Sequence, residues 1–176
     1  MVMKQEKIMN KQHVIEFIKM LNNLDAIMAK AAASADTKKF DVNNFLSERL
    51  IADMLPFSKQ VQIACDGAKF CAAYMSHTTP PKFEDNEKTW TELRARIVKT
   101  VEYLRTMVEA DYSKFKEAKV APSWAGGQWL NGEEYFYEMA LPNFYFHMTT
   151  AYALLRKSGV EIGKGDFLGA LNFKKP

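Results

Sequence analysis

The sequence has no uninterrupted run of 18 or more apolar residues, and its opening "MVMKQEKIMNKQ" has no hydrophobic signal core. A helix that spans a bilayer needs about 20 predominantly apolar residues, and a secretory signal needs an apolar centre. We therefore expect no membrane partner and predict a cytoplasmic protein.

Cysteine is scarce, with only Cys65 and Cys71 in 176 residues. On a helix of 3.6 residues per turn, a spacing of six rotates one side chain about 240° from the other. The pair therefore shares no helical face and fits neither a disulfide framework nor a zinc knuckle. Small buried thiols in a reducing compartment are the expected interpretation.

Common catalytic and nucleic-acid signatures are also missing. The chain has no Walker loop, no G-x-S-x-G, no H-E-x-x-H and no paired C-x-x-C. The net charge is only +3, and Lys and Arg are scattered among Asp and Glu. Because nucleic-acid binding needs a concentrated basic surface, we expect no nucleic-acid partner.

The residues that are present predict helices. Apolar residues make up 48% of the chain and recur at three- and four-residue steps, which is typical of amphipathic helices. We predict a flexible N-terminus over 1–11 and a single domain over 12–176, an all-α four-helix bundle. The expected helices cover about 12–35, about 50–75, about 86–108 and 131–158. The stripe of the second helix turns small at Ala64, Ala68 and Cys71, where a neighbour can approach closely.

The segments between these helices carry their own signals. Asp85 or Asn86 is expected to cap the third helix, and the charged side chains along it, Arg96 included, are expected to face solvent. The long loop before the fourth helix, "KVAPSWAGGQWLNG", contains two tryptophans and is expected to fold back over the bundle, with room for a short extended pair. Asn131 and Glu134 have the spacing of a capping pair.

Two prolines fall within predicted helices. Pro56 predicts either a kink or the true start of the second helix, because an internal proline removes a hydrogen bond and clashes with the preceding turn. Pro142 likewise deprives the carbonyl of Glu138 of its usual donor. If the two breaks face each other, the bundle bends near Gln60 and His147, and a cavity is expected there.

Asn143 and His147 are four residues apart and therefore lie on one helical face. A structural interpretation has His147 donating a hydrogen bond to a carboxylate or carbonyl on a neighbouring helix. A second interpretation is a ligand set, with Asp53 and Gln60 reaching across from one face of the second helix. Tyr152, on the same aromatic helix, completes the candidate pocket residues.

Four strings resemble a known family: "LIADMLPFSKQVQIACDGAK", "PPKFEDNEKTWTELRARI", "ALPNFYFHMTTAYALLRKSGVEIGK" and "DFLG". They look like domain-of-unknown-function family one-nine-nine-three, which is placed with the DinB/YfiT-like helical bundles. The resemblance covers roughly residues 12–170. It implies an up-down-down-up topology, a homodimer, and a divalent metal held by three histidines, one on the second helix and two on the fourth.

The chain departs from that metal pattern at two of three positions. His147 matches the last histidine, but Asn143 stands four residues before it, and no histidine lies between Leu50 and Ser76. We therefore predict a small-molecule-binding protein of unknown function with a degenerate site and no metal cofactor. The alternative is a metal-dependent enzyme, transferase- or hydrolase-like, in which a divalent metal binds His147 and Asn143 in a bundle-end cavity.

Overall fold

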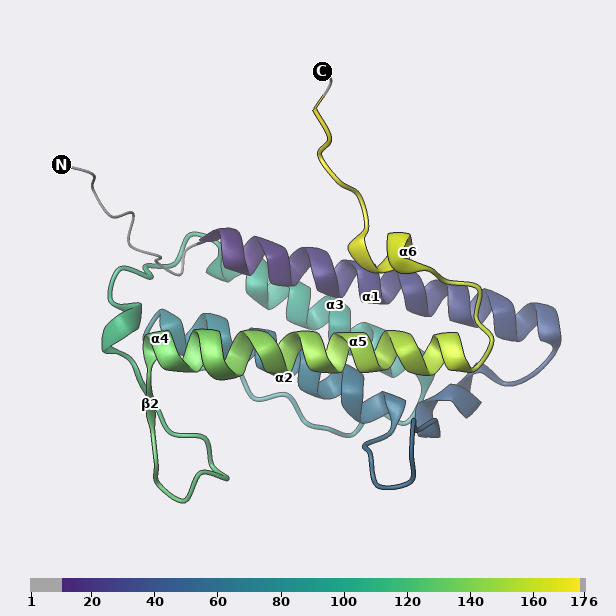
Figure 1. Cartoon of the computed structure of the whole chain (residues 1–176), viewed down its shortest axis with the longest axis horizontal. Helices are drawn as coiled ribbons and strands as arrows, with labels where there is room; N and C mark the ends of the chain where they lie inside the picture. The colour runs from purple at the N-terminus through teal and green to yellow at the C-terminus, as the bar shows by residue number, and fades with distance from the viewer. Residues whose placement is uncertain (1–10, 175–176) are drawn as a thin grey trace.

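A computed structural model of the protein describes residues 11–174. Four long helices form its body: α1 (Lys11–Lys38), α2 (Phe57–Met75), α3 (Trp90–Met107) and α5 (Leu141–Lys157) (Figure 1). The predicted flexible N-terminus, 1–11, falls outside the described residues except for Lys11, which begins α1. Within the described part, no helix is long and apolar enough to cross a membrane.

Shorter elements join the four helices. The 3-10 helix η1 (Val42–Ser47) precedes α2, and η2 (Phe115–Glu117), β1 (Lys119–Val120), β2 (Leu130–Asn131), α4 (Gly132–Glu134) and the π-helix η3 (Tyr135–Ala140) precede α5. The helix α6 (Lys164–Leu168) packs on α1. The strands β1 and β2 pair antiparallel, and Asn131 and Glu134 form a reciprocal capping box. The predicted extended pair and cap are thus confirmed.

The topology is up-down-down-up, as the resemblance implied. The first residues of α2 and α3, Phe57 and Trp90, stack with ring centroids 5.1 Å apart, so these helices start at the same end and run parallel. Phe17 of α1 and Phe144 of α5, each in the first half of its helix, meet at 4.7 Å, and both helices begin at the end of the bundle where α2 and α3 finish (Figure 1). The crossover, residues 76–89, links the end of α2 to the start of α3 and runs back along the bundle (Figure 1).

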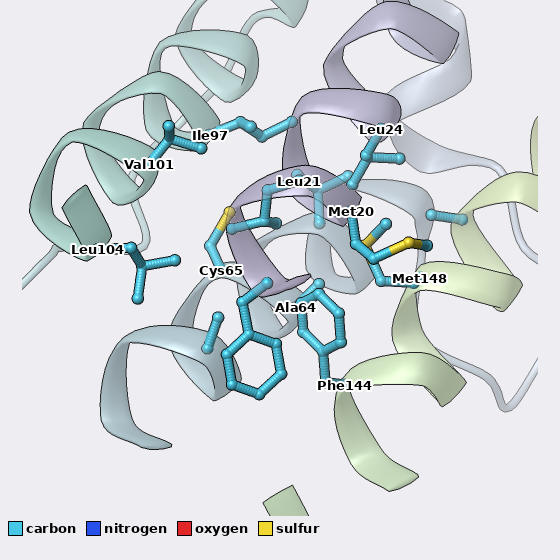
Figure 2. Close-up of a cluster of buried hydrophobic side chains, with 14 of the residues drawn as sticks. Met20, Leu21, Leu24, Ala64, Cys65, Ile97, Val101, Leu104, Phe144 and Met148 are labelled. Atoms are coloured by element: carbon cyan, nitrogen blue, oxygen red, sulfur yellow. The ribbon is translucent and has the colours of Figure 1, made fainter. Parts of the chain in front are cut away.

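The core lies where the four helices meet. Figure 2 shows side chains from all four converging, with Leu21, Cys65, Leu104 and Phe144 among them. Helix α2 packs against both α3 and α5. Its small residues Ala64, Ala68 and Cys71 are fully buried, which confirms the predicted close approach, and both cysteines are free buried thiols.

Three boundaries differ from the sequence-based predictions. Helix α2 begins at Phe57 with Pro56 as its N-cap, which confirms the alternative that Pro56 marks the true start of the helix; the apolar stripe does not extend back to Leu50, which is 42% exposed. The residue before a proline is sterically biased away from helical geometry, which explains the late start. Helix α1 continues three residues beyond Ala35, to Lys38. Helix α3 begins at Trp90 and is capped by Thr89, so the expected cap at Asp85 or Asn86 is wrong. The Thr89 side chain accepts from the Glu92 N–H, and the Glu92 side chain accepts from the Thr89 N–H.

Arg96 corrects the prediction that the charged face of α3 is solvated. Its side chain is 1% exposed and lies 2.9 Å from carboxylate oxygens of Asp66, Asp85 and Glu87. It also donates to the carbonyl of Glu84. One cation therefore joins α3 to α2 and to the crossover, and a buried arginine with this many acceptors fits the rule that buried charges are paired.

We predict that Arg96→Met destabilises the protein by about 3 kcal/mol, because three carboxylates lose the cation they surround. Arg94→Met is the matched control: its ion pair with Asp25 is partly exposed, so its loss should cost at most about 1 kcal/mol. Chemical denaturation of both variants measures the difference. Equal destabilisation by the two substitutions would contradict the role assigned to Arg96.

Candidate functional site

An open hollow of about 720 Å³ lies along the start of α5. Its lining comes from the segment before α2, from α2, from the tryptophan loop, from η3 and from α5. The lining residues are Leu55, Ile63, Trp124, Glu138, Met139, Pro142, Asn143, Phe146 and His147. Apolar side chains thus form most of the wall, with three polar groups among them, which is the usual make-up of a small-molecule site.

The backbone beside the hollow is irregular because of Pro142. This residue stands in the first turn of α5 and has no N–H, and the π-helix η3 directly precedes it. A π-helix widens the turn, and such segments occur frequently at functional sites. Glu138 and Met139 come from this widened turn and line the hollow. The predicted cavity near a proline break is therefore present beside Pro142.

His147 is held by a hydrogen bond to α2. Its Nδ1 lies 2.7 Å from Oε1 of Gln60, while Nε2 of Gln60 donates to the carbonyl of Leu55 at 2.9 Å. Because the amide nitrogen of Gln60 is used on Leu55, its oxygen faces the imidazole and accepts from Nδ1. The structural interpretation of His147, donation to a carbonyl on a neighbouring helix, is confirmed, and the acceptor is a side-chain amide.

The same bond determines what His147 offers to the hollow. A neutral imidazole that donates through Nδ1 carries its lone pair on Nε2. No other described residue forms a hydrogen bond with this ring. Burial lowers the pKa of the His147 imidazole, which favours the neutral form at neutral pH. His147 therefore presents a hydrogen-bond acceptor on the wall of an apolar hollow.

The structure brings together three of the five predicted site residues. Asn143 and His147 line the hollow, and Gln60 is buried behind His147. The side chain of Asn143 leans toward α2, where its Nδ2 would lie 3.9 Å from a Cβ built on Gly67.

Asp53 and Tyr152 lie outside this group. Asp53 is exposed in the turn before α2, because the helix that would place it on one face with Gln60 starts only at Phe57. Tyr152 packs edge-on against Phe167, which follows α5 in the chain. Neither of these two residues lines the hollow.

Comparison with known proteins identifies the family of the chain. A family described as Domain of unknown function (DUF1993) matches residues 9–168. The chain belongs to this family. A crystal structure of a DinB family member from Shewanella denitrificans is 45% identical, with a TM-score of 0.87 over 93% of each chain. No functionally curated protein matches the sequence.

The residues present do not fit the three-histidine metal centre that the family resemblance implies. His147 is the one histidine on the hollow, and its Nδ1 is already bonded to Gln60. Within residues 11–174, no three His, Cys, Asp or Glu side chains gather as a metal site requires. Glu138 and Asn143 would have to supply the remaining ligands, and an amide is a weak one for metals that prefer imidazole.

Sequence reasoning missed several residues of the hollow. Trp124 and Phe146 flank it with exposed rings, and Glu138 adds a carboxylate. For Trp124 the signal was present, since two tryptophans in a loop predicted that the loop folds back. For Glu138 the only signal was its place four residues before Pro142, which predicted a freed carbonyl and not the use of its side chain.

We predict that the His147 pKa makes stability depend on pH. A histidine with a lowered folded-state pKa leaves the unfolded chain binding more protons below the unfolded value of about 6.5. The free energy of unfolding should therefore fall as pH decreases from about 8 to about 5. In His147→Gln this contribution should vanish. Denaturation at several pH values measures the difference between the two proteins, and a difference that is constant or of opposite sign would contradict it.

Proposed function

We propose that the protein binds a small, largely apolar molecule that carries a hydrogen-bond donor. The observation that supports this is the bare Nε2 of His147, fixed in place by Gln60 on the wall of the hollow. The apolar walls supply affinity through buried surface, at roughly 25 cal/mol per Å². The single oriented acceptor supplies direction and selectivity.

Binding alone is the function that these groups support best. A neutral histidine on an apolar wall accepts a hydrogen bond from a ligand, and the described residues that line the hollow include no nucleophilic Ser or Cys. The homodimer and the cytoplasmic location stay predictions from the sequence.

Phenethyl alcohol and phenethyl methyl ether are matched probes, because only the alcohol donates a hydrogen bond. Ligand-observed NMR titration should show the alcohol binding about tenfold more tightly, which corresponds to roughly 1.4 kcal/mol for one hydrogen bond. The variant His147→Phe should erase this preference, because it removes the acceptor and keeps an apolar ring.

Thr149→Ala is the control, since Thr149 is exposed on α5 and lies outside the hollow. It should leave both affinities unchanged. Equal binding of alcohol and ether by the unmodified protein, or binding of neither, would argue against the proposed function.

The competing proposal is a metal-dependent enzyme, transferase- or hydrolase-like, that uses His147 as a ligand. It requires a stoichiometric divalent metal in protein purified without an affinity tag, lost in His147→Ala. Because the hollow offers one imidazole, one carboxylate and one amide, we expect no stoichiometric metal in either protein. Elemental analysis decides between the two proposals.

A further inference from the structure

We propose that the ligand of the hollow is an organic cation, an ammonium group on an apolar or aromatic body. This inference rests on the proposed function and specifies its ligand class. It is carried by three features of the hollow: the sign of its charge, the unpaired state of that charge, and the aromatic rings that border it.

The charge of the hollow is opposite to that of the protein as a whole. The chain has 24 Lys and Arg against 21 Asp and Glu. Nevertheless, Glu138 is the only ionised side chain among the nine lining residues, and none is Lys or Arg. Two other hollows of about 400 Å³ have no excess of negative charge. One has Lys30 and Lys38 with Glu161, and the other balances three cations against three glutamates, namely Lys82, Arg96 and Lys99 against Glu84, Glu87 and Glu92. This hollow alone of the three favours a positive guest.

The carboxylate of Glu138 has no partner among the described residues. It forms no ion pair or hydrogen bond with any residue of 11–174. In the hollow lined by Lys82 and Arg96, by contrast, Glu87 is bonded to both Arg96 and Gln62. Glu138 is exposed to solvent, so its attraction for a cation acts through water and weakens as salt is added. Glu138 is thus available to pair with a bound cation.

The rings at the edge of the hollow suit an ammonium group. Trp124 and Phe146 are 75% and 54% exposed, so their faces are open. A cation over an aromatic face gains about 0.5–1 kcal/mol at an exposed site, and tryptophan is the best ring for it. The chain already uses this contact in the same loop region, where Nζ of Lys119 lies 4.8 Å from the centroid of Trp129.

The neutral polar groups agree with an ammonium donor. Nε2 of His147 accepts, and the side-chain oxygen of Asn143 can accept as well. A primary ammonium has three N–H donors, which matches these two acceptors together with Glu138. An anionic ligand would find no cation on the wall and one carboxylate opposing it.

Three probes that share a phenylethyl body test the charge: phenethylammonium, phenethyl alcohol and hydrocinnamate. Titrated at low ionic strength by ligand-observed NMR, the ammonium should bind about tenfold more tightly than the alcohol, and hydrocinnamate should bind weakest. Added salt should weaken the ammonium only, since ionic attraction is screened.

Glu138→Gln should reduce the ammonium to the affinity of the alcohol and leave the alcohol unchanged. Glu133→Gln is the matched control, because Glu133 is exposed in the preceding turn, lies near Lys116 and does not line the hollow. It should change none of the three affinities. Circular dichroism checks that both variants keep their helices.

The outcomes separate the two proposals. Alcohol binding as tight as or tighter than ammonium binding overturns the cation inference and leaves the proposed function standing. Tightest binding of hydrocinnamate, or an ammonium preference that survives in Glu138→Gln, also overturns it. Binding of none of the three overturns the proposed function and this inference together.

Discussion

Close packing on two sides of α2 is the constraint from which the rest of the structure follows. Twelve of its nineteen residues are buried, because both α3 and α5 pack against it. Ala64, Ala68 and Cys71 leave room for those neighbours. A helix packed in this way has to bring any polar group it carries to a partner, since a buried polar group without one is costly. Arg96 of α3 pairs with Asp66 of α2, and His147 of α5 bonds to Gln60 of α2.

The candidate site is the outcome of this constraint at one end of α2. Because α2 starts only after Pro56, the carbonyl of Leu55 lies outside the helix and accepts a hydrogen bond from the side-chain amide of Gln60. Gln60 then turns its oxygen to His147 and sets which ring nitrogen holds the proton. Across the hollow, Pro142 has a comparable effect on the other helix, where η3 widens the turn that carries Glu138. Two proline breaks thus determine both the acceptor and the space in front of it.

The sequence predicted what depends on periodicity and missed what depends on tertiary charge. The four helices, the small seam and the spacing of Asn143 and His147 follow from local rules, and the structure has them. The predicted position of Asp53 on a face of α2 is wrong because this helix begins only at Phe57. Arg96 was assigned to solvent because its acceptors come from α2 and from the crossover, whose path no periodicity reveals.

Although two of the three histidines that the family resemblance implies are absent, the site keeps an oriented base, His147. In metal centres a histidine ligand donates its second ring N–H to an outer partner, which fixes the tautomer and the ring direction. Gln60 performs that orienting role for His147 here. The lone pair that would face a metal therefore keeps its direction, although Asn143 cannot replace a second imidazole. An oriented, neutral acceptor beside a carboxylate and open aromatic rings suits a donor with positive charge, so the proposed binding of an organic cation needs no metal at this site.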